Sequence, residues 1–179
     1  LFRRLISTKI FRRGIFLSRD DLKNVLAARR FFKKNKDRFH VYFVEANSKI
    51  VNLKKIYSKP NTVFNLALTS NGSNSVAVTK LYLSNDDELS QQSSIFIEKG
   101  NVSQNSFTIA LGVPAAIFFK VLKEHIESEL ANYSIFVRLN CEGIEDDVIY
   151  AAYDSFGDKL KLICGSLKDV KEIKGDKAY

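Results

Sequence analysis

The chain has 179 residues, of which 45% are hydrophobic and 14 are phenylalanine, enough for one folded domain with a core and an extension. This composition excludes an intrinsically disordered chain, and without an uninterrupted apolar run of about 18 residues we expect no membrane span. The two cysteines, Cys141 and Cys164, form no C-x-x-C pair, which argues against a disulfide scaffold or a cysteine-rich zinc site.

The net charge of +8 is divided unevenly along the chain. Residues 1–60 carry 17 Lys or Arg and 4 Asp or Glu, a net charge of +13, whereas residues 61–179 carry 11 and 16, a net charge of −5. A basic arm joined to a mildly acidic body indicates that one end contacts nucleic acid or an anionic membrane surface. A basic tail that is merely well solvated is the plain alternative.

Residues 1–18 (LFRRLISTKIFRRGIFLS) interleave apolar residues with arginines, and six basic residues precede the first acid, Asp20. This pattern is typical of an arginine-rich organelle transit peptide and lacks the continuous apolar core of a secretory signal. It favours import into mitochondria and a location in the matrix. We expect the segment to be retained and to be ordered by a partner, because so basic an arm cannot bury a core alone.

Residues 18–36 are predicted to form one short helix within a basic N-terminal arm that covers residues 1–38. Ser18 is a suitable N-cap, acids follow it in the first turn, and bases gather near the C-terminal end, as the helix dipole favours. Phe31 and Phe32 are expected either to pack on the body or to stack on RNA bases.

The body is predicted to extend over residues 39–170, followed by a polar C-terminal tail over residues 171–179. Its first strands are expected, in chain order, at residues 40–45, 62–69, 75–83, 94–99 and 106–111. The dipeptide Asn71-Gly72 is a strong hairpin signal between the second and third of these strands. We therefore expect them to form a meander.

Pro114 suits the first turn of a helix, which is predicted over residues 114–130. Its expected core-facing stripe consists of Ile117, Phe118, Val121, Leu122 and Ile126. A strand over residues 134–139, a helix over 145–155 and a strand over 159–164 follow, and a connecting helix implies that these two strands pair in parallel. The prediction is a single α/β domain with a mixed β-sheet, in which the meander is followed by helix-strand-helix-strand, plus the basic N-terminal extension.

Residues suited to acid, base or metal chemistry are present, but their spacing favours structural roles. His40 and His125 lie far apart, and the chain contains no H-E-x-x-H, Walker loop or G-x-G-x-x-G motif. The acid runs 86–88 and 145–147 consist of adjacent carboxylates, whereas a two-metal nuclease needs acids that converge from separate elements. We therefore expect no metal site and no cofactor.

Cys141 lies between a predicted strand and a predicted helix, a place where a thiolate can be activated, but no histidine is matched to it. We expect a protein that is not an enzyme and has no small-molecule substrate. Alanine in place of Cys141, His125 or Asp147 is expected to leave function intact and to change stability by about 1 kcal/mol.

Three segments carry a resemblance to a known family. Residues 68–79 (LTSNGSNSVAVT) are similar to its hairpin, residues 114–116 (PAA) to the start of its long helix, and residues 135–138 (IFVR) to the strand that follows. Over residues 61–170 the chain thus resembles the universal small-subunit ribosomal protein eleven family, in a divergent mitochondrial form.

Gly143, Glu145 and Val148 occupy positions similar to the turn and second helix of that family. Two of the family's basic features are missing: Ile144 stands at the position of an arginine, and the loop over residues 100–105 carries no base. The resemblance therefore implies that the basic arm, rather than these loops, carries the RNA contact.

The resemblance implies a structural constituent of the mitochondrial small ribosomal subunit, which braces ribosomal RNA and contacts neighbouring ribosomal proteins. Arm cations would neutralise RNA phosphates. The expected RNA-binding residues are Arg3, Arg4, Lys9, Arg12, Arg13, Arg29, Arg30, Lys33, Lys34, Lys36 and Arg38. An accessory soluble subunit of a mitochondrial respiratory or ATP-synthase complex, with the arm on protein or anionic lipid, is the main alternative. A free RNA-binding protein or a small enzyme is a third, and the enzyme is the least favoured of these alternatives.

Overall fold

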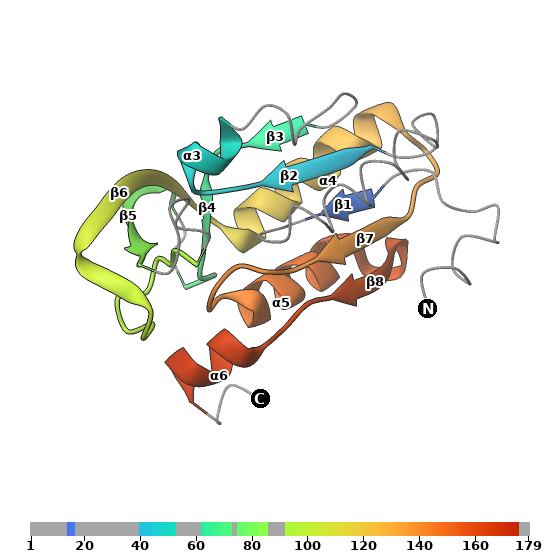
Figure 1. Cartoon of the computed structure of the whole chain (residues 1–179). Helices are drawn as coiled ribbons and strands as arrows, with labels where there is room; N and C mark the ends of the chain where they lie inside the picture. Colours follow the sequence, from blue (N-terminus) through green and yellow to red (C-terminus); the bar gives the residue numbers. More distant parts are fainter. Residues whose placement is uncertain (1–13, 17–39, 53–61, 73–74, 86–91, 176–179) are drawn as a thin grey trace.

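The structure of the chain, a computed structural model, describes residues 14–16, 40–52, 62–72, 75–85 and 92–175 (Figure 1). Within these ranges, helices and strands are mixed in a single α/β domain, as the sequence predicts. The order helix, strand, helix, strand in the second half of the chain is also as predicted.

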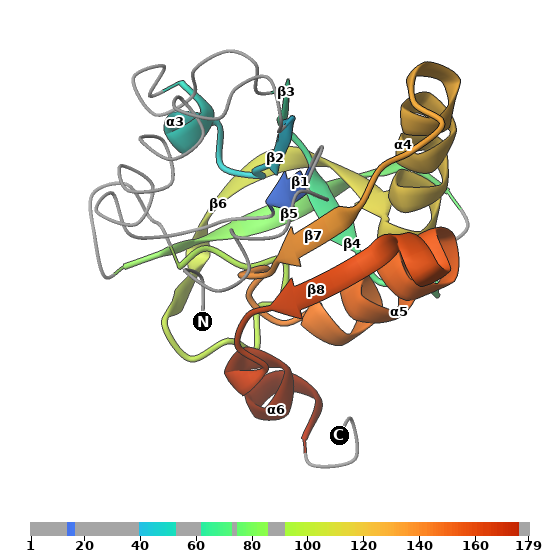
Figure 2. The same cartoon turned by 90° about the vertical axis from the view of Figure 1, so that its right-hand side faces the viewer.

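Five short strands lie side by side in the order β3, β2, β1, β7 and β8 (Figure 1, Figure 2). Their bounds in that order are Thr62–Phe64, Val41–Val44, Gly14–Phe16, Ile135–Arg138 and Leu160–Cys164. Hydrogen bonds join the first three into one parallel sheet, and β7 and β8 into another. The parallel pairing of β7 with β8 confirms the prediction made from the helix that connects them.

Strand β1 belongs to the segment that the sequence assigns to the basic arm. It pairs in parallel with β2, with Gly14 opposite Val41 and Phe16 opposite Phe43, and it separates β2 from β7 in both views (Figure 1, Figure 2). All the strands expected from the sequence lie after residue 38, whereas β1 precedes it. Three residues are too few to show a strand periodicity, so the sequence pattern gave no sign of this pairing.

Helices α4 (Ala115–Glu129) and α5 (Glu145–Phe156) cover the same face of these strands (Figure 2). Both agree with their predicted bounds to within one residue. The main core lies between the helices and the strands, and it contains edge-to-face aromatic contacts. The centre of the Phe119 ring lies 5.4 Å from the centre of the Phe118 ring and 5.9 Å from that of the Phe156 ring.

The buried stripe of α4 differs from the predicted one, because it includes Ala115 and Phe119 and excludes Val121. Val121 was expected in the core, but its side chain is 58% exposed, whereas Phe119 is fully buried. The stripe consists of Ala115, Phe118, Phe119, Leu122 and Ile126. At 100° per residue, position 121 is turned 200° from position 119, so burial of Phe119 places Val121 on the outer side. Ile117 packs partly buried against the core, as expected.

The strand predicted over residues 62–69 is divided into two. Residues 62–64 form β3, whereas Ala67–Thr69 forms β4 in a different sheet, where it runs parallel to β6 (Val102–Pro114). Between them, Asn65 Nδ2 donates to the carbonyl oxygens of Glu45 and Ala46, at 2.9 and 3.2 Å, and holds the chain where it leaves one sheet for the other. Because β2, β3 and β4 all take part in parallel pairs, the expected meander is wrong for these strands.

A long antiparallel ribbon is formed by β5 (Ala77–Ser84) and β6, and it curves away from the parallel strands (Figure 1). Strand β6 lies between β4 and β5, so the predicted hairpin across Asn71-Gly72 is wrong. Residues 94–99 were expected to form a strand, but only an isolated bridge joins Ser94 to Tyr82. The expected strand over residues 106–111 lies within β6.

Helix α6 (Lys168–Lys174) crosses the predicted boundary between the body and the polar tail over residues 171–179, and its Val170 is buried. A short helix, α3 (Ser48–Val51), and a 3₁₀ turn, η1 (Gly157–Lys159), complete the described elements. The helix predicted over residues 18–36 lies outside the described residues.

Candidate functional site

The residues predicted to bind RNA all lie outside the described residues, so their contacts stay a prediction. They are Arg3, Arg4, Lys9, Arg12, Arg13, Arg29, Arg30, Lys33, Lys34, Lys36 and Arg38. Phe31, Phe32 and the acid run at residues 86–88 also lie outside. The described residues instead contain two features that have the properties of a site: a polar junction and an exposed sheet face.

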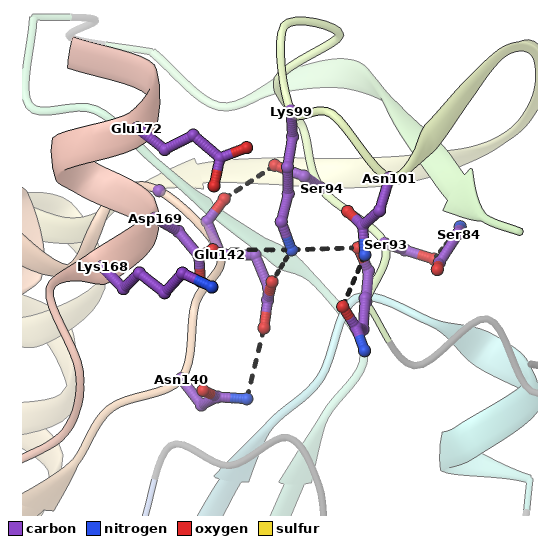
Figure 3. A network of polar contacts seen from close by, with 12 residues as sticks. Ser84, Ser93, Ser94, Lys99, Asn101, Asn140, Glu142, Lys168, Asp169 and Glu172 are labelled. Carbon is purple, nitrogen blue, oxygen red and sulfur yellow. Dashed lines mark hydrogen bonds and ion pairs between the residues drawn. The ribbon is translucent and has the colours of Figure 1, made fainter. Parts of the chain in front are cut away.

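The polar junction joins the segment 92–101, the loop after β7 and helix α6 (Figure 3). Lys99 lies at its centre, only 5% exposed, and forms an ion pair with Glu142, which is also 5% exposed. Its Nζ also donates to the carbonyl oxygen of Gln92 at 3.3 Å and lies 3.9 Å from Asp169 Oδ1. A buried ammonium group needs such partners, because desolvation of an unpaired charge is costly.

The loop after β7 has an unusual backbone conformation at this junction. Glu142 has a φ of 59°, in the left-handed region that side chains rarely adopt, and Ser94 Oγ donates to its carbonyl oxygen at 2.7 Å. Gly143 follows with a φ of 121°. A Cβ at Gly143 would clash with Ile173 of α6 and lie 3.0 Å from the ring of Phe96. Only glycine therefore fits where these segments meet.

Glu145, in the first turn of α5, holds the same loop from the other side. Its Oε1 accepts the backbone N–H groups of Cys141 and Glu142, both at 2.8 Å, and its Oε2 accepts that of Gly143 at 2.9 Å. Burial raises the pKa of Glu145 above its ordinary value, and the backbone N–H groups partly offset this effect. The three consecutive N–H groups of the loop that precedes α5 are thus bound by the chain's own carboxylate.

Asp147 ties the turn after β4 to α5 and α6. Its Oδ1 accepts from the Asn71 N–H at 3.1 Å and from Ser70 Oγ at 3.2 Å, and its Oδ2 accepts from Lys174 at 2.9 Å. Asn71 Nδ2 donates to the Asp147 carbonyl oxygen at 3.0 Å, and Asn71 Oδ1 accepts the Ala116 N–H at 2.8 Å. Asn71 thus caps α4 from a distance, which explains why this turn does not form a simple hairpin.

These contacts give each acid of the run 145–147 a partner within the chain, and Lys174 is shared by Asp146 and Asp147. Asp146 accepts from Lys174 Nζ at 2.7 and 2.9 Å, while its two neighbours hold the loop and the turn. Burial raises the pKa of Cys141 to about 12, so its thiol stays protonated at neutral pH and is a poor nucleophile. The side chain of His125 is half exposed, and its Nε2 lies 4.0 Å from Glu129 Oε1.

The exposed sheet face lies on one side of the β5–β6 ribbon. Cross-strand pairing brings together Val78 with Leu111, Lys80 with Ile109 and Tyr82 with Phe107. We call these six residues the ribbon face: Val78, Lys80, Tyr82, Phe107, Ile109 and Leu111. Side chains alternate along a strand, so all six lie on one side. Val78 is 73% and Ile109 68% exposed.

The sequence interpretation did not identify the ribbon face or the Lys99–Glu142 pair. For the ribbon face a signal was present, because the strand residues 77–83 and 107–111 both alternate. Apolar residues occupy both sides of that alternation, however, and the sequence alone did not decide which side meets the core. For Lys99 no local pattern distinguishes a buried lysine from an exposed one.

Comparison with family models, with curated proteins and with solved structures finds no match to this chain. No described helix is both long and apolar enough to cross a membrane. In the part of the chain that the structure describes, no three His, Cys, Asp or Glu side chains are grouped so that they could hold a metal ion.

Proposed function

We propose that this chain is a structural, RNA-binding constituent of the mitochondrial small ribosomal subunit, located in the matrix. The observation that carries the proposal is the division of charge, +13 over residues 1–60 and −5 over residues 61–179. A cationic segment on a mildly anionic domain supplies phosphate contacts and counterion release, whereas the domain provides a scaffold. The ribosomal assignment itself rests on the resemblance of residues 61–170.

The buried charges of the body support a scaffolding role. Lys99, Glu142 and Glu145 all bind groups within the chain, and they fix loops rather than present reactive groups to solvent. The protonated thiol of Cys141 is consistent with the same role.

The decisive measurement is the RNA content of the assembly that contains the full chain. The tagged protein, purified from cells that produce it, is expected to bring down small-subunit ribosomal RNA in stoichiometric amount. An assembly without RNA that contains respiratory or ATP-synthase subunits would overturn the proposal in favour of the accessory-subunit alternative.

A salt titration then tests whether the arm carries the RNA contact. With about six phosphates engaged, log affinity should fall with log salt with a slope of about −4 to −5. Deletion of the whole arm is unsuitable, because it would remove β1 from the sheet. Glutamine in place of four arm residues is the better change, and it should reduce the slope by about 3. The four are Arg29, Arg30, Lys33 and Lys34.

The matched control neutralises four bases of the body, Lys120, Lys123, Lys161 and Lys168, in the same way. Because the control changes the net charge by the same amount, any general charge effect appears in both variants. An equal change of slope in the two would show that the arm has no special part in RNA binding.

A further inference from the structure

The ribbon face is apolar on the outside of the molecule although the opposite side of the same ribbon is packed. On that opposite side, Leu81 is 3% and Ala110 9% exposed, and both pack with Ala67 in a small core cluster. On the ribbon face itself, the side chain of Val78 is 73% exposed and that of Ile109 is 68% exposed. Single exposed apolar side chains are ordinary, but a contiguous set of them marks an interaction surface.

Charge on the ribbon face is confined to one cation. Lys80 sits between Val78 and Tyr82 along β5, and its Nζ lies 4.4 Å from the centre of the Phe107 ring. The other five residues of the ribbon face are uncharged, and the ion pairs among the described residues do not include Lys80. Any partner that covers this surface must therefore desolvate a lone ammonium group.

The chemistry of the ribbon face selects among three kinds of partner. RNA is disfavoured, because the two most exposed apolar residues, Val78 and Ile109, offer neither a stacking ring nor a donor. The Phe107 ring already contacts the Lys80 ammonium group, and one lysine neutralises only one phosphate. A second copy of the chain is disfavoured, because the face carries no acid that could pair with Lys80 of the other copy. Lys80 also lies in the middle of the face, so a symmetric contact centred there would place the two Lys80 side chains near each other. A different protein that presents a carboxylate can bury the apolar side chains of the ribbon face and, at the same time, form an ion pair with Lys80.

We infer that the ribbon face docks a neighbouring protein that presents an apolar surface with an Asp or Glu opposite Lys80. The inference deepens the proposed function, because it names the surface through which the chain contacts a protein neighbour in its assembly. Burial of the apolar side chains of the ribbon face stabilises the complex. The single ion pair at Lys80 fixes how the partner is aligned and excludes partners that lack the acid.

A carbodiimide cross-link tests the charge pair directly. The reagent activates a carboxylate, and an amine in contact with it displaces the activating group to form an amide, while the reagent leaves as its urea. In the purified assembly of the full chain, we expect an amide between Lys80 Nζ and an Asp or Glu of a different protein, found by peptide mass spectrometry. Lys80→Arg should keep the chain in the assembly but lose the cross-link, because guanidinium is not coupled.

Incorporation of variant chains into the assembly tests the contribution of the apolar side chains of the ribbon face. Val78→Thr with Ile109→Thr retains β-branched side chains and strand propensity, and it should lower incorporation of the chain at least about tenfold in competition with wild type. The matched control is Val121→Thr, an exposed valine on α4 that should be incorporated normally. Thermal unfolding followed by circular dichroism verifies that all three chains fold.

The inference is overturned by a Lys80 cross-link to a second copy of the chain, by the absence of any cross-link, or by equal incorporation of the double variant and wild type. A photoreactive residue at position 109 that labels RNA rather than protein would overturn it as well. The proposed function fails separately: an assembly without ribosomal RNA that still gives the Lys80 cross-link would contradict the ribosomal assignment and retain the docking surface.

Discussion

The polar junction and the ribbon face use their side chains in opposite ways. At the junction, Lys99, Glu142 and Glu145 are nearly fully buried, and each is bound by groups of the same chain. On the ribbon face, Val78 and Ile109 are apolar and mostly exposed. The buried charges therefore serve the stability of the loops, whereas the exposed apolar residues contribute little to it and are available for contact.

The largest expected effect is at Lys99. Lys99→Met should lower the free energy of unfolding by about 3–5 kcal/mol, because it leaves Glu142 charged and buried without its cation. Urea unfolding followed by circular dichroism measures the loss. The double variant with Glu142→Gln should recover most of it, and Lys120→Met on the exposed side of α4 should cost less than about 0.5 kcal/mol. A loss at Lys99 no larger than at Lys120 would show that the buried pair does not stabilise the junction.

Asp147 should have the next largest effect, and here the structure revises the sequence expectation of about 1 kcal/mol. Asp147→Ala removes the acceptor for Ser70, Asn71 and Lys174, so we expect a loss of about 2–3 kcal/mol in the same unfolding assay. Asp154→Ala, at an exposed position of the same helix, is the control. Equal losses of unfolding free energy for the two variants would show that Asp147 stabilises the fold no more than an exposed acid does.

Glu145 should make stability depend on pH in a defined direction. Its pKa is raised in the folded state by burial, so its contribution is fully present below the unfolded value of about 4.3 and is lost as pH rises through the folded pKa. Glu145→Gln removes this dependence. The stability of wild type relative to the variant should thus be greatest near pH 4 and decline toward pH 7. A difference that grows with pH would mean that the three N–H groups outweigh desolvation and lower the pKa.

The smallest effect on stability is expected on the ribbon face. Val78→Thr and Ile109→Thr should each change the free energy of unfolding of the isolated chain by less than about 0.5 kcal/mol. Leu81→Ala, on the packed side of the same strand, should cost about 2–4 kcal/mol because it leaves a cavity. If Val78→Thr lowers the free energy of unfolding as much as Leu81→Ala does, the ribbon face contributes to the core. The contrast drawn above between the ribbon face and the polar junction would then be wrong.

Local patterns in the sequence determined the helices α4 and α5, the strands β7 and β8 and the division of charge. The apolar pattern of α4 and the presence of Pro114 near its start gave its bounds to within one residue. The helix between β7 and β8 implied their parallel pairing. These features depend on residues close together in the chain, where periodicity carries the information.

Only the tertiary structure decided the contacts between distant residues. It placed β1 between β2 and β7, inserted β6 between β4 and β5, and buried Phe119 instead of Val121. It also joined Asn71 to α4 and α5, so that a turn with a hairpin sequence became a helix cap. Strand order, the choice of buried face and the pairing of Lys99 with Glu142 depend on partners far away in sequence, and the physical cause is that burial is settled by what packs on each face and not by local preference.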